Sequence, residues 1–348
     1  MNTKLWVVDK ITNLSTTYPH ITQAAHLLRE NEVVAFPTET VYGLGANACS
    51  DEAVRKIYQA KGRPSDNPLI VHIASVNKLD EIVKDIPNYA YKLIDEFWPG
   101  PLTLILPKKG DRLSTLVTAG LDTVGVRMPS HPIALSLIRE ADVPIAAPSA
   151  NQSGKPSPTH ASHVYHDLNG KISGIIDGGA TGVGVESTVL DCSSTVPTIL
   201  RPGGVTKEQL ESVIGEVQLD QALIEEGLAP KSPGMKYTHY APNAPVVIVN
   251  GRLEFLQKII DQHQKEGKKV GVLTTEEAFN QLEAYKVIAC GRRANLQTVA
   301  AELYDVLRKF DNEEVDIIFS ESFPQSGVGE AIMNRLLKAA GNQVIEEY

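Results

Sequence analysis

The chain has 348 residues, of which 42% are apolar and 22% are charged, and its formal net charge is -9. At about 150 residues per domain, this length and composition predict two globular domains. The net negative charge argues against a protein whose whole surface binds nucleic acid. Any phosphate contacts would therefore be made by a few cations in a cleft. The sequence has no apolar run of about 20 residues and no secretory signal at its N-terminus. We therefore expect a soluble, cytoplasmic protein that does not bind membranes.

Three cysteines, Cys49, Cys192 and Cys290, are far apart in the sequence. An odd number without a C-x-x-C pair argues against a disulfide framework and against a thiolate zinc site. We expect three buried free thiols, because free cysteine is usually buried.

The first part of the chain alternates predicted helices and strands. Apolar residues at helical spacing predict the helices His20–Asn31, Ser50–Ala60, Tyr89–Trp98 and one whose first turn holds Pro132. Short apolar runs predict the strands Val33–Phe36, Leu69–Ile73, Thr103–Leu106, Val124–Arg127 and Pro144–Ala147. Three further strands have only turns between them, which indicates antiparallel pairing: Gly174–Asp177, Ser187–Asp191 and Thr198–Arg201. We expect a mixed-sheet α/β domain over residues 1–226, with its core at about 18–214.

Residues 227–245 form the clearest linker, GLAPKSPGMKYTHYAPNAP. Its prolines prevent regular structure over most of its length. Its aromatic residues indicate docking on a surface, and we expect a lid over the active site; a simple connector with chance aromatics is the alternative.

Residues 246–348 alternate strand and helix more regularly. The predicted strands are Val246–Val249, Val270–Leu273, Val287–Ala289 and Asp316–Phe319. The predicted helices are Arg252–Gln264, Glu276–Glu283, Leu296–Phe310 and Glu330–Ala340. Such a series predicts a smaller, mostly parallel α/β domain.

Familiar phosphate and catalytic motifs are missing from the sequence: it has no G-x-x-x-x-G-K-[ST] loop, no H-E-x-x-H and no nucleophile elbow. Two cations, Lys61 and Arg63, instead end a predicted helix ahead of Asn67. They suit a polyphosphate, with Arg63 as a planar fork and Lys61 as a point charge. Alternatively they satisfy the helix dipole and its last carbonyls.

Other candidate residues follow predicted strands. The segment PTETVYGLG, residues 37–45, is a ligand loop or a structural turn, and APSAN, residues 147–151, is a ligand loop or an ordinary polar loop. Arg127 ends an apolar strand and needs an anionic partner, which could be a ligand carboxylate, Glu39 or Glu186. Arg201 also ends a predicted strand, and its partner could likewise be a ligand or a carboxylate of the protein.

Taken together and in order, the segments PTETVYGLG, KGRPSDNPLIVHI, FWPGPLT, VGVRMPSHP, APSANQSG and ESTVLD resemble the L-threonylcarbamoyladenylate synthase family, over about Ile21 to Ile214. The family's K-x-R and S-x-N signatures match Lys61, Arg63, Ser149 and Asn151. The linker and the second α/β domain resemble the long, two-domain branch. The resemblance implies a twisted mixed-sheet YrdC-like domain, then a Rossmann-like domain.

The resemblance also implies ligand contacts and a reaction. Implied ATP contacts are Lys61, Arg63, Asn67, Thr123, Ser149, Asn151, Ser157, Arg201 and Tyr240, with Lys61 and Arg63 as the catalytic pair. Implied threonine contacts are Thr38, His72, Arg127, the backbone at Ala147, and Ser187. Threonine, bicarbonate and ATP would give threonylcarbamoyl-AMP and pyrophosphate, with Mg²⁺ arriving on ATP. The metal ligands stay open among Asp66, Glu39 and Glu186.

The implied product passes to the complex that transfers the threonylcarbamoyl group to tRNA, and the chain itself would bind tRNA weakly if at all. Two alternatives stay open: an RNA-binding protein that uses the same concave face, and an enzyme that handles carbamoyl phosphate or carbamoyl-adenylate. Interleaved basic and aromatic residues, which favour the first, are missing from the sequence.

Overall fold

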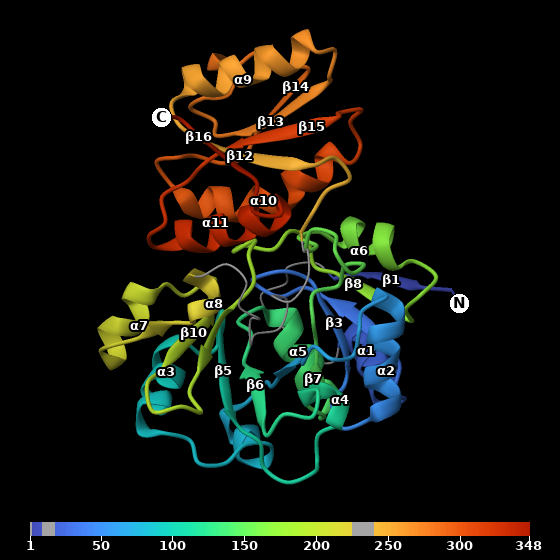
Figure 1. Ribbon diagram of the computed structural model, residues 1–348. Coiled ribbons are helices and arrows are strands. Elements are labelled where there is room, and N and C mark those ends of the chain that lie inside the picture. The colour runs from blue at the N-terminus through green and yellow to red at the C-terminus, as the bar shows by residue number, and fades with distance from the viewer. Residues whose placement is uncertain (1, 9–17, 225–239) are drawn as a thin grey trace. The chain divides into compact units, whose positions relative to one another are not determined.

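The computed structural model describes residues 2–8, 18–224 and 240–348. These fall into two compact units (Figure 1). The first unit comprises Met1–Ser153, Pro158–Gly182 and Glu186–Lys236, and the second comprises Gly154–Ser157, Val183–Val185 and Tyr237–Tyr348. Most of the predicted linker, residues 227–239, lies outside the described residues, so the domain and lid assignments stay predictions.

One large sheet organises the first unit. In the described residues its strands are β1 (Lys4–Val7), β2 (Val34–Phe36), β3 (Gly43–Asn47), β4 (Ile70–His72), β5 (Leu102–Pro107), β6 (Thr123–Arg127), β7 (Ile145–Ala146), β8 (Gly174–Asp177), β9 (Thr188–Asp191), β10 (Thr198–Arg201) and β11 (Gln218–Leu219). Their order across the sheet is β1-β8-β2-β3-β7-β4-β6-β5-β9-β10-β11. The pairing is mixed, which confirms the predicted fold class.

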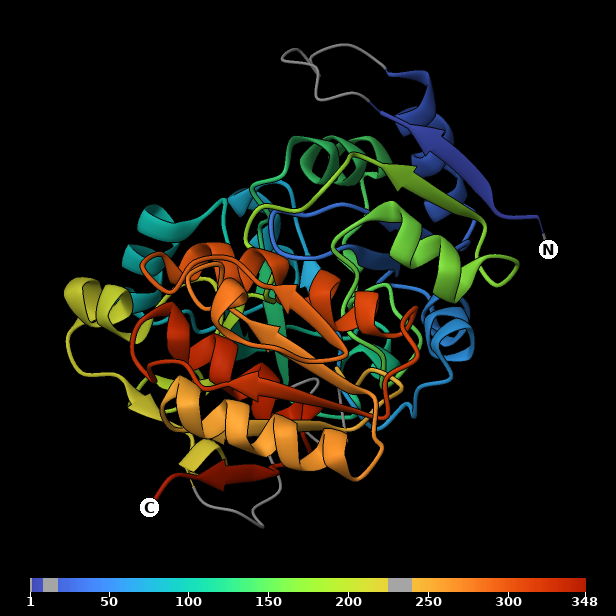
Figure 2. The same ribbon diagram turned by 90° about the horizontal axis from the view of Figure 1, so that it is seen from above.

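One detail of the predicted pairing is wrong. Strands β9 and β10 are antiparallel, as expected for strands joined by a turn. Strand β8, however, pairs parallel with both β1 and β2 at the far end of the sheet (Figure 2). The segment between β8 and β9 passes across several strands of the sheet. The sequence did not predict this crossing, because the segment is short.

Helices cover the two faces of this sheet unequally. One face packs against the helices α2 (Asp51–Lys61), α3 (Asn88–Phe97), α4 (Thr115–Thr118), α6 (Ala161–Leu168) and α7 (Lys207–Ile214). The other face packs against α1 (Pro19–Arg29) and α5 (Pro132–Ala141) at the end formed by β1, β8, β2, β3 and β7. The unit also holds the short helices η1 (Val76–Glu81) and α8 (Gln221–Ile224).

Beyond the α1–α5 layer, this second face carries polar side chains. Strand residues alternate between faces, and the register pairs His72 with Arg127 and Ile70 with Gly125. Thr103 lies between Leu102 and Leu104, which both belong to the core on the opposite face. The face over β4, β6 and β5 therefore presents His72, Arg127 and Thr103 together.

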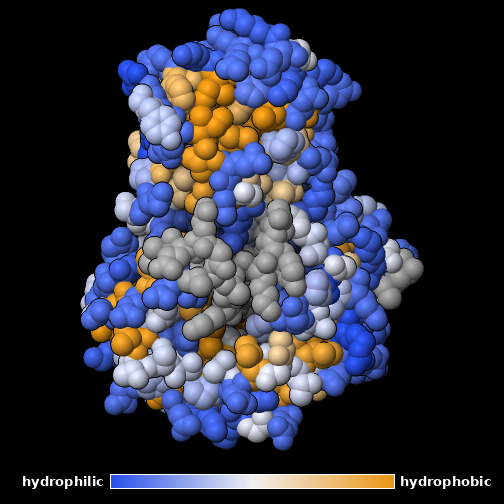
Figure 3. All heavy atoms as spheres, in the orientation of Figure 1, coloured by the Kyte–Doolittle hydropathy of each residue, from blue (hydrophilic) through white to orange (hydrophobic). Residues whose placement is uncertain are grey.

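The second unit is an α/β layer structure with a parallel sheet. Its strands are β12 (Val246–Asn250), β13 (Val270–Thr274), β14 (Lys286–Ala289), β15 (Ile317–Glu321) and β16 (Val344–Glu346), in the order β14-β13-β15-β12-β16. Each of these neighbouring strands pairs parallel with the next, which confirms the prediction. Helix α9 (Leu253–Lys265) lies on one face, and α10 (Leu296–Phe310) and α11 (Val328–Ala339) lie on the other (Figure 1). Figure 3 shows apolar residues of this unit gathered at the level of the sheet, between polar outer surfaces.

Two sequence predictions need correction. The helix expected at Glu276–Glu283 is only a single 3₁₀ turn, η2 (Phe279–Gln281). Among the cysteines, Cys192 and Cys290 are buried but Cys49 is exposed, where it follows β3. Within the described residues, no helix combines the length and the apolar character needed to cross a membrane.

Candidate functional site

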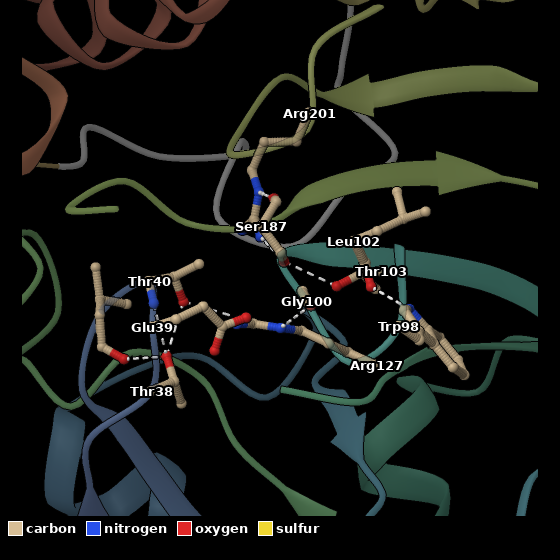
Figure 4. Close-up of polar contacts among 11 residues, drawn as sticks. Thr38, Glu39, Thr40, Trp98, Gly100, Leu102, Thr103, Arg127, Ser187 and Arg201 are labelled. Carbon is tan, nitrogen blue, oxygen red and sulfur yellow. Dashed lines mark hydrogen bonds and ion pairs between the residues drawn. The ribbon is translucent and has the colours of Figure 1, made fainter. Parts of the chain in front are cut away.

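Arg127 stands at the end of β6 with only 4% of its surface exposed. Its Nε donates to the Gly100 carbonyl (3.2 Å), its Nη1 donates to the Thr40 hydroxyl (3.0 Å), and its Nη2 donates to the Glu39 carboxylate. The sequence analysis named Glu39 as one of three possible anionic partners of Arg127, and the structure shows an ion pair between these two residues (Figure 4). We call Thr38, Glu39, Thr40, Gly100 and Arg127 the Arg127 cluster.

The turn after β2 forms the other side of the Arg127 cluster. The Thr38 hydroxyl donates to the Val41 carbonyl (2.6 Å), accepts from the Thr40 N–H (3.2 Å), and lies 2.8 Å from the Thr40 hydroxyl. Such short-range bonds from threonine fix a turn. They hold Glu39 toward the guanidinium, while Gly43–Asn47 continues as strand β3. The segment is therefore a turn followed by a strand, and the turn itself is part of the polar face.

A β-bulge brings Arg201 to the same face. The register of β10 against β9 shifts between Ile199 and Arg201, which redirects the side chain. The Arg201 Nε and Nη2 donate to the Ser187 carbonyl (3.2 and 3.0 Å), and Nη2 lies 3.2 Å from the Ser187 hydroxyl. That hydroxyl is 2.8 Å from the hydroxyl of Thr103, beside Arg127 (Figure 4).

Gly203 permits this close approach. A Cβ at this position would come within 2.3 Å of the Glu186 carbonyl oxygen and 2.4 Å of the Thr188 nitrogen. Because both are backbone atoms, any side chain would push the segment after β10 away from β9. The glycine thereby keeps Arg201 in reach of Ser187.

His72 adds a neutral group beside Arg127. Its Nδ1 lies 3.2 Å from the Ile70 carbonyl oxygen, and the residue is buried. Burial, and then the Arg127 charge, lower the pKa of His72 to about 3. The ring is therefore uncharged near neutral pH and does not compete with Arg127 for an anion.

A second polar group, which we call the Lys61 cluster, consists of Lys61, Ser149 and Asn151. Lys61 is the last residue of α2, which ends at Gly62 in the left-handed conformation (φ 62°). The Lys61 Nζ donates to the carbonyls of Ser149 and Asn151, the latter at 2.6 Å, and lies 3.4 Å from the Asn151 side-chain oxygen. The Ser149 hydroxyl donates to that same oxygen. The lysine therefore organises the loop after β7 rather than capping only its own helix.

Arg63 and Asn67 flank the Lys61 cluster. The Arg63 Nη2 lies 3.4 Å from the carbonyl oxygens of Asn67 and Pro68. The Tyr58 hydroxyl donates to the Asn67 carbonyl at 3.0 Å. Burial raises the pKa of Tyr58 to about 12, so the hydroxyl stays protonated and remains a donor.

Strand directions place the two clusters at opposite ends of β4. Strand β4 is parallel to β6 but antiparallel to β7. The loop after β7, which carries Ser149, therefore lies where β4 begins, and Arg127 lies where β4 ends. Between them the Ala147 N–H donates to the Ile70 carbonyl (2.9 Å). At about 3.3 Å per residue, a three-residue strand separates the clusters by roughly 10 Å.

The structure groups most of the predicted ligand residues as the resemblance implied, although their roles stay predictions. At the Arg127 end lie four of the five residues predicted for threonine: Thr38, His72, Arg127 and Ser187. The fifth, Ala147, lies between the two ends, where its N–H donates to the Ile70 carbonyl. At the Lys61 end lie six of those predicted for ATP: Lys61, Arg63, Asn67, Thr123, Ser149 and Asn151. Arg201, also predicted for ATP, instead contacts Ser187 at the Arg127 end.

Two predicted ATP residues, Ser157 and Tyr240, belong to the second unit. Within that unit, Tyr240 stacks on Tyr304 with ring centroids 5.2 Å apart, and the Arg335 guanidinium lies 5.6 Å from the Tyr240 ring centroid. Tyr240 adopts a positive φ of 67°, uncommon for a bulky side chain.

Sequence reasoning missed the hydroxyls that support the arginines. Thr103 was assigned only to a strand, yet its place between Leu102 and Leu104 marks it as the polar member of an alternating run. Thr40 is one of two threonines in the segment PTETVYGLG. Which of their hydroxyls faces Arg127 depends on the conformation of the turn, which the sequence did not predict.

The mixed sheet with its polar face and the second, parallel unit define the class of the protein as two-domain α/β. A family model described as telomere recombination matches residues 26–203, and one described as the C-terminal domain of threonylcarbamoyl-AMP synthase matches residues 205–341. The chain belongs to the two-domain Sua5 family of threonylcarbamoyl-AMP synthases.

Two relatives and one solved structure illustrate the similarity. The chain is 63% identical over 345 residues to the threonylcarbamoyl-AMP synthase of Bacillus subtilis, covering 99% of this chain and 100% of the relative. It is 49% identical over 328 residues to that of Pyrococcus abyssi, covering 93% and 94%. The crystal structure of P. abyssi Sua5 complexed with L-threonine superimposes with a TM-score of 0.93 at 47% identity, covering 99% and 100% of the two chains.

Proposed function

We propose that this chain joins L-threonine, bicarbonate and ATP into threonylcarbamoyl-AMP and releases pyrophosphate, as a nucleotidyltransferase. The observation that carries the proposal is the pair of clusters at the two ends of β4, one built around Arg127 and one around Lys61. Their separation suits a substrate that carries a carboxylate at one end and phosphates at the other. Membership of the Sua5 family and the similarity to a threonine-bound relative support the same reaction.

At the Arg127 end, the proposed substrate is the amino acid. A buried guanidinium is a strong partner for a carboxylate because it offers a planar fork of donors. The hydroxyls of Thr38 and Ser187 and the neutral His72 ring supply further polar contacts without adding a second cation. The α-amino group then reacts with bicarbonate, giving the carbamate and water.

At the Lys61 end, the proposed substrate is ATP. A carbamate oxygen attacks the α-phosphorus, a new P–O bond forms, and the bond to pyrophosphate breaks. This step needs no protein nucleophile, so catalysis rests on position and charge. Lys61, already held by two loop carbonyls, and Arg63 beside it would stabilise charge that develops on the phosphates.

Magnesium is proposed to enter with ATP. In the described part of the chain, no group of three or more His, Cys, Asp and Glu residues is placed to hold a metal ion. Mg²⁺ commonly keeps several waters and binds through substrate phosphates, so the chain would need to supply few ligands. When bound it would offset negative charge on the triphosphate.

The product is proposed to serve tRNA modification. Threonylcarbamoyl-AMP is a mixed anhydride that transfers its acyl group readily, so the enzyme that consumes it must be an acyltransferase. We propose that this acyltransferase is the complex that transfers the threonylcarbamoyl group to tRNA. The present chain would act in the cytoplasm and bind tRNA weakly if at all.

We expect pyrophosphate release from ATP to require both threonine and bicarbonate, because the attacking carbamate contains both. Coupled detection of pyrophosphate, with each substrate omitted in turn, measures this. Bicarbonate must be removed by degassing under nitrogen. Equal release without threonine would contradict the proposal and would favour the carbamoyl-handling alternative.

A further inference from the structure

Glu39 has a carboxylate oxygen whose position calls for a ligand. Its Oε1 accepts from Arg127 Nη2, whereas its Oε2 is buried and has no hydrogen-bond partner among the described residues. Figure 4 shows this second oxygen turned away from the guanidinium. A buried acceptor without a partner destabilises the folded protein, because it has lost its hydrogen bonds to water. Native structures rarely keep such an atom without a reason, and a role in binding or catalysis is one such reason.

Arg127 has donors left as well. A guanidinium has five N–H groups, and three of them are used by Gly100, Thr40 and Glu39. Two N–H groups are therefore available to a ligand without breaking the pair. The Arg127 cluster thus offers two donors and one charged acceptor side by side, held in place by the Thr38–Thr40 turn.

We propose that Glu39 binds the α-amino nitrogen of the amino-acid substrate while Arg127 binds its carboxylate. This proposal rests on the proposed function, since it assigns a residue to the amino-acid end of that site. An α-amino acid carries its amine and its carboxylate on one carbon. Adjacent acceptor and donor groups from one ion pair match that spacing.

The role would last through the reaction. Threonine's ammonium, its neutral amine and the N–H of its carbamate can each donate one hydrogen bond to Glu39 Oε2. The carboxylate therefore holds the nitrogen while bicarbonate is added, and it does so by position alone. Glu39 is in this sense a substrate-binding residue, and no proton transfer is assigned to it.

Magnesium is the competing occupant of this oxygen, and the surroundings favour the amine. Oε1 of the same carboxylate already binds a guanidinium, so a divalent cation on Oε2 would sit close to a fixed positive charge. Mg²⁺ also prefers octahedral oxygen ligands. The polar neighbours here are threonine hydroxyls, which accept hydrogen bonds but do not balance a divalent charge.

The test compares two ligands on two proteins by isothermal titration calorimetry of the full chain without ATP. The ligands are L-threonine and its analogue with a hydroxyl in place of the α-amine, 2,3-dihydroxybutyrate. The wild type should bind threonine about tenfold or more tightly than the analogue, as expected for a charge-assisted hydrogen bond. In Glu39→Gln that preference should fall to about threefold or less, while the analogue still binds.

A matched control is Glu32→Gln. Glu32 follows α1 and pairs with Lys56 on α2, in the same unit but outside the Arg127 cluster. It should keep the wild-type preference for threonine. If Glu39→Gln also keeps that preference, or if it changes only the magnesium dependence of ATP use, the assignment is overturned. A wild type that binds neither ligand would overturn the proposed function as well, so the two failures are distinguishable.

Discussion

Replacing Lys61 by alanine is expected to lower the rate of adenylate formation by about a hundred- to a thousandfold. Loss of one preorganised group that stabilises developing charge costs about 3–4 kcal/mol of barrier. In this chain the lysine also holds the carbonyls of Ser149 and Asn151, so the loop after β7 loses its anchor at the same time. Single-turnover formation of the adenylate, measured with saturating substrates, gives the rate.

Two variants separate the chemistry from the fold. Arg63→Ala should also lower the rate by orders of magnitude, although Arg63 makes weaker contacts with its own loop, at 3.4 Å. Lys56→Ala, on the same helix, removes a lysine paired with Glu32 and should leave the rate near that of the wild type. Circular dichroism and thermal midpoints show whether each variant is folded. A folded Lys61→Ala protein with near-normal turnover would limit Lys61 to a structural role at the end of α2 and the loop after β7.

Replacing Arg127 by lysine is expected to raise the KM for threonine by about ten- to a hundredfold while the KM for ATP changes little. Lysine keeps the charge but cannot donate to Gly100, Thr40 and Glu39 and still offer two parallel donors to a carboxylate. Loss of a hydrogen bond to a charged group is worth about 1.5–3 kcal/mol, which corresponds to this range. Initial rates with each substrate varied in turn give the two constants.

Arg55→Lys is the matched control, because Arg55 is exposed on α2 in the same unit. It should leave both constants unchanged. If Arg127→Lys raises the KM values of threonine and ATP equally, Arg127 supports the sheet as a whole rather than binding the amino acid.

The sequence predicted the second unit better than the first. Strands such as Val270–Leu273 are continuous apolar runs, and helix Leu296–Phe310 has apolar residues at helical spacing over its whole length. The local sequence therefore predicts the structure of each segment directly. In the first unit, β3 (Gly43–Asn47) is rich in glycine and looked like a loop, because Gly43 and Gly45 lack the side chains that mark a strand. A Cβ at Gly45 would come 2.7 Å from the Phe36 ring, so close packing requires the glycine there.

For the site, the sequence predicted which residues need partners but not which partners they find. Arg127 stood out as a charge among apolar strand residues, and the structure supplies Glu39, 88 positions away in sequence. That contact depends on the order of strands across the sheet, which local patterns do not encode. The bulge before Arg201 is similar, because a one-residue shift in register decides whether its side chain meets Ser187.

The most direct test of the central claim is mass analysis of the product formed from ATP, L-threonine and ¹³C-labelled bicarbonate. Threonylcarbamoyl-AMP should appear, heavier by one neutron than the product from unlabelled bicarbonate, because the carbamate carbon comes from bicarbonate. When the adenylate is hydrolysed, the AMP should carry no label, because the labelled carbon belongs to the carbamoyl group and leaves as carbon dioxide. An adenylate without the label, such as threonyl-AMP, or no adenylate at all in the complete mixture, would contradict the account.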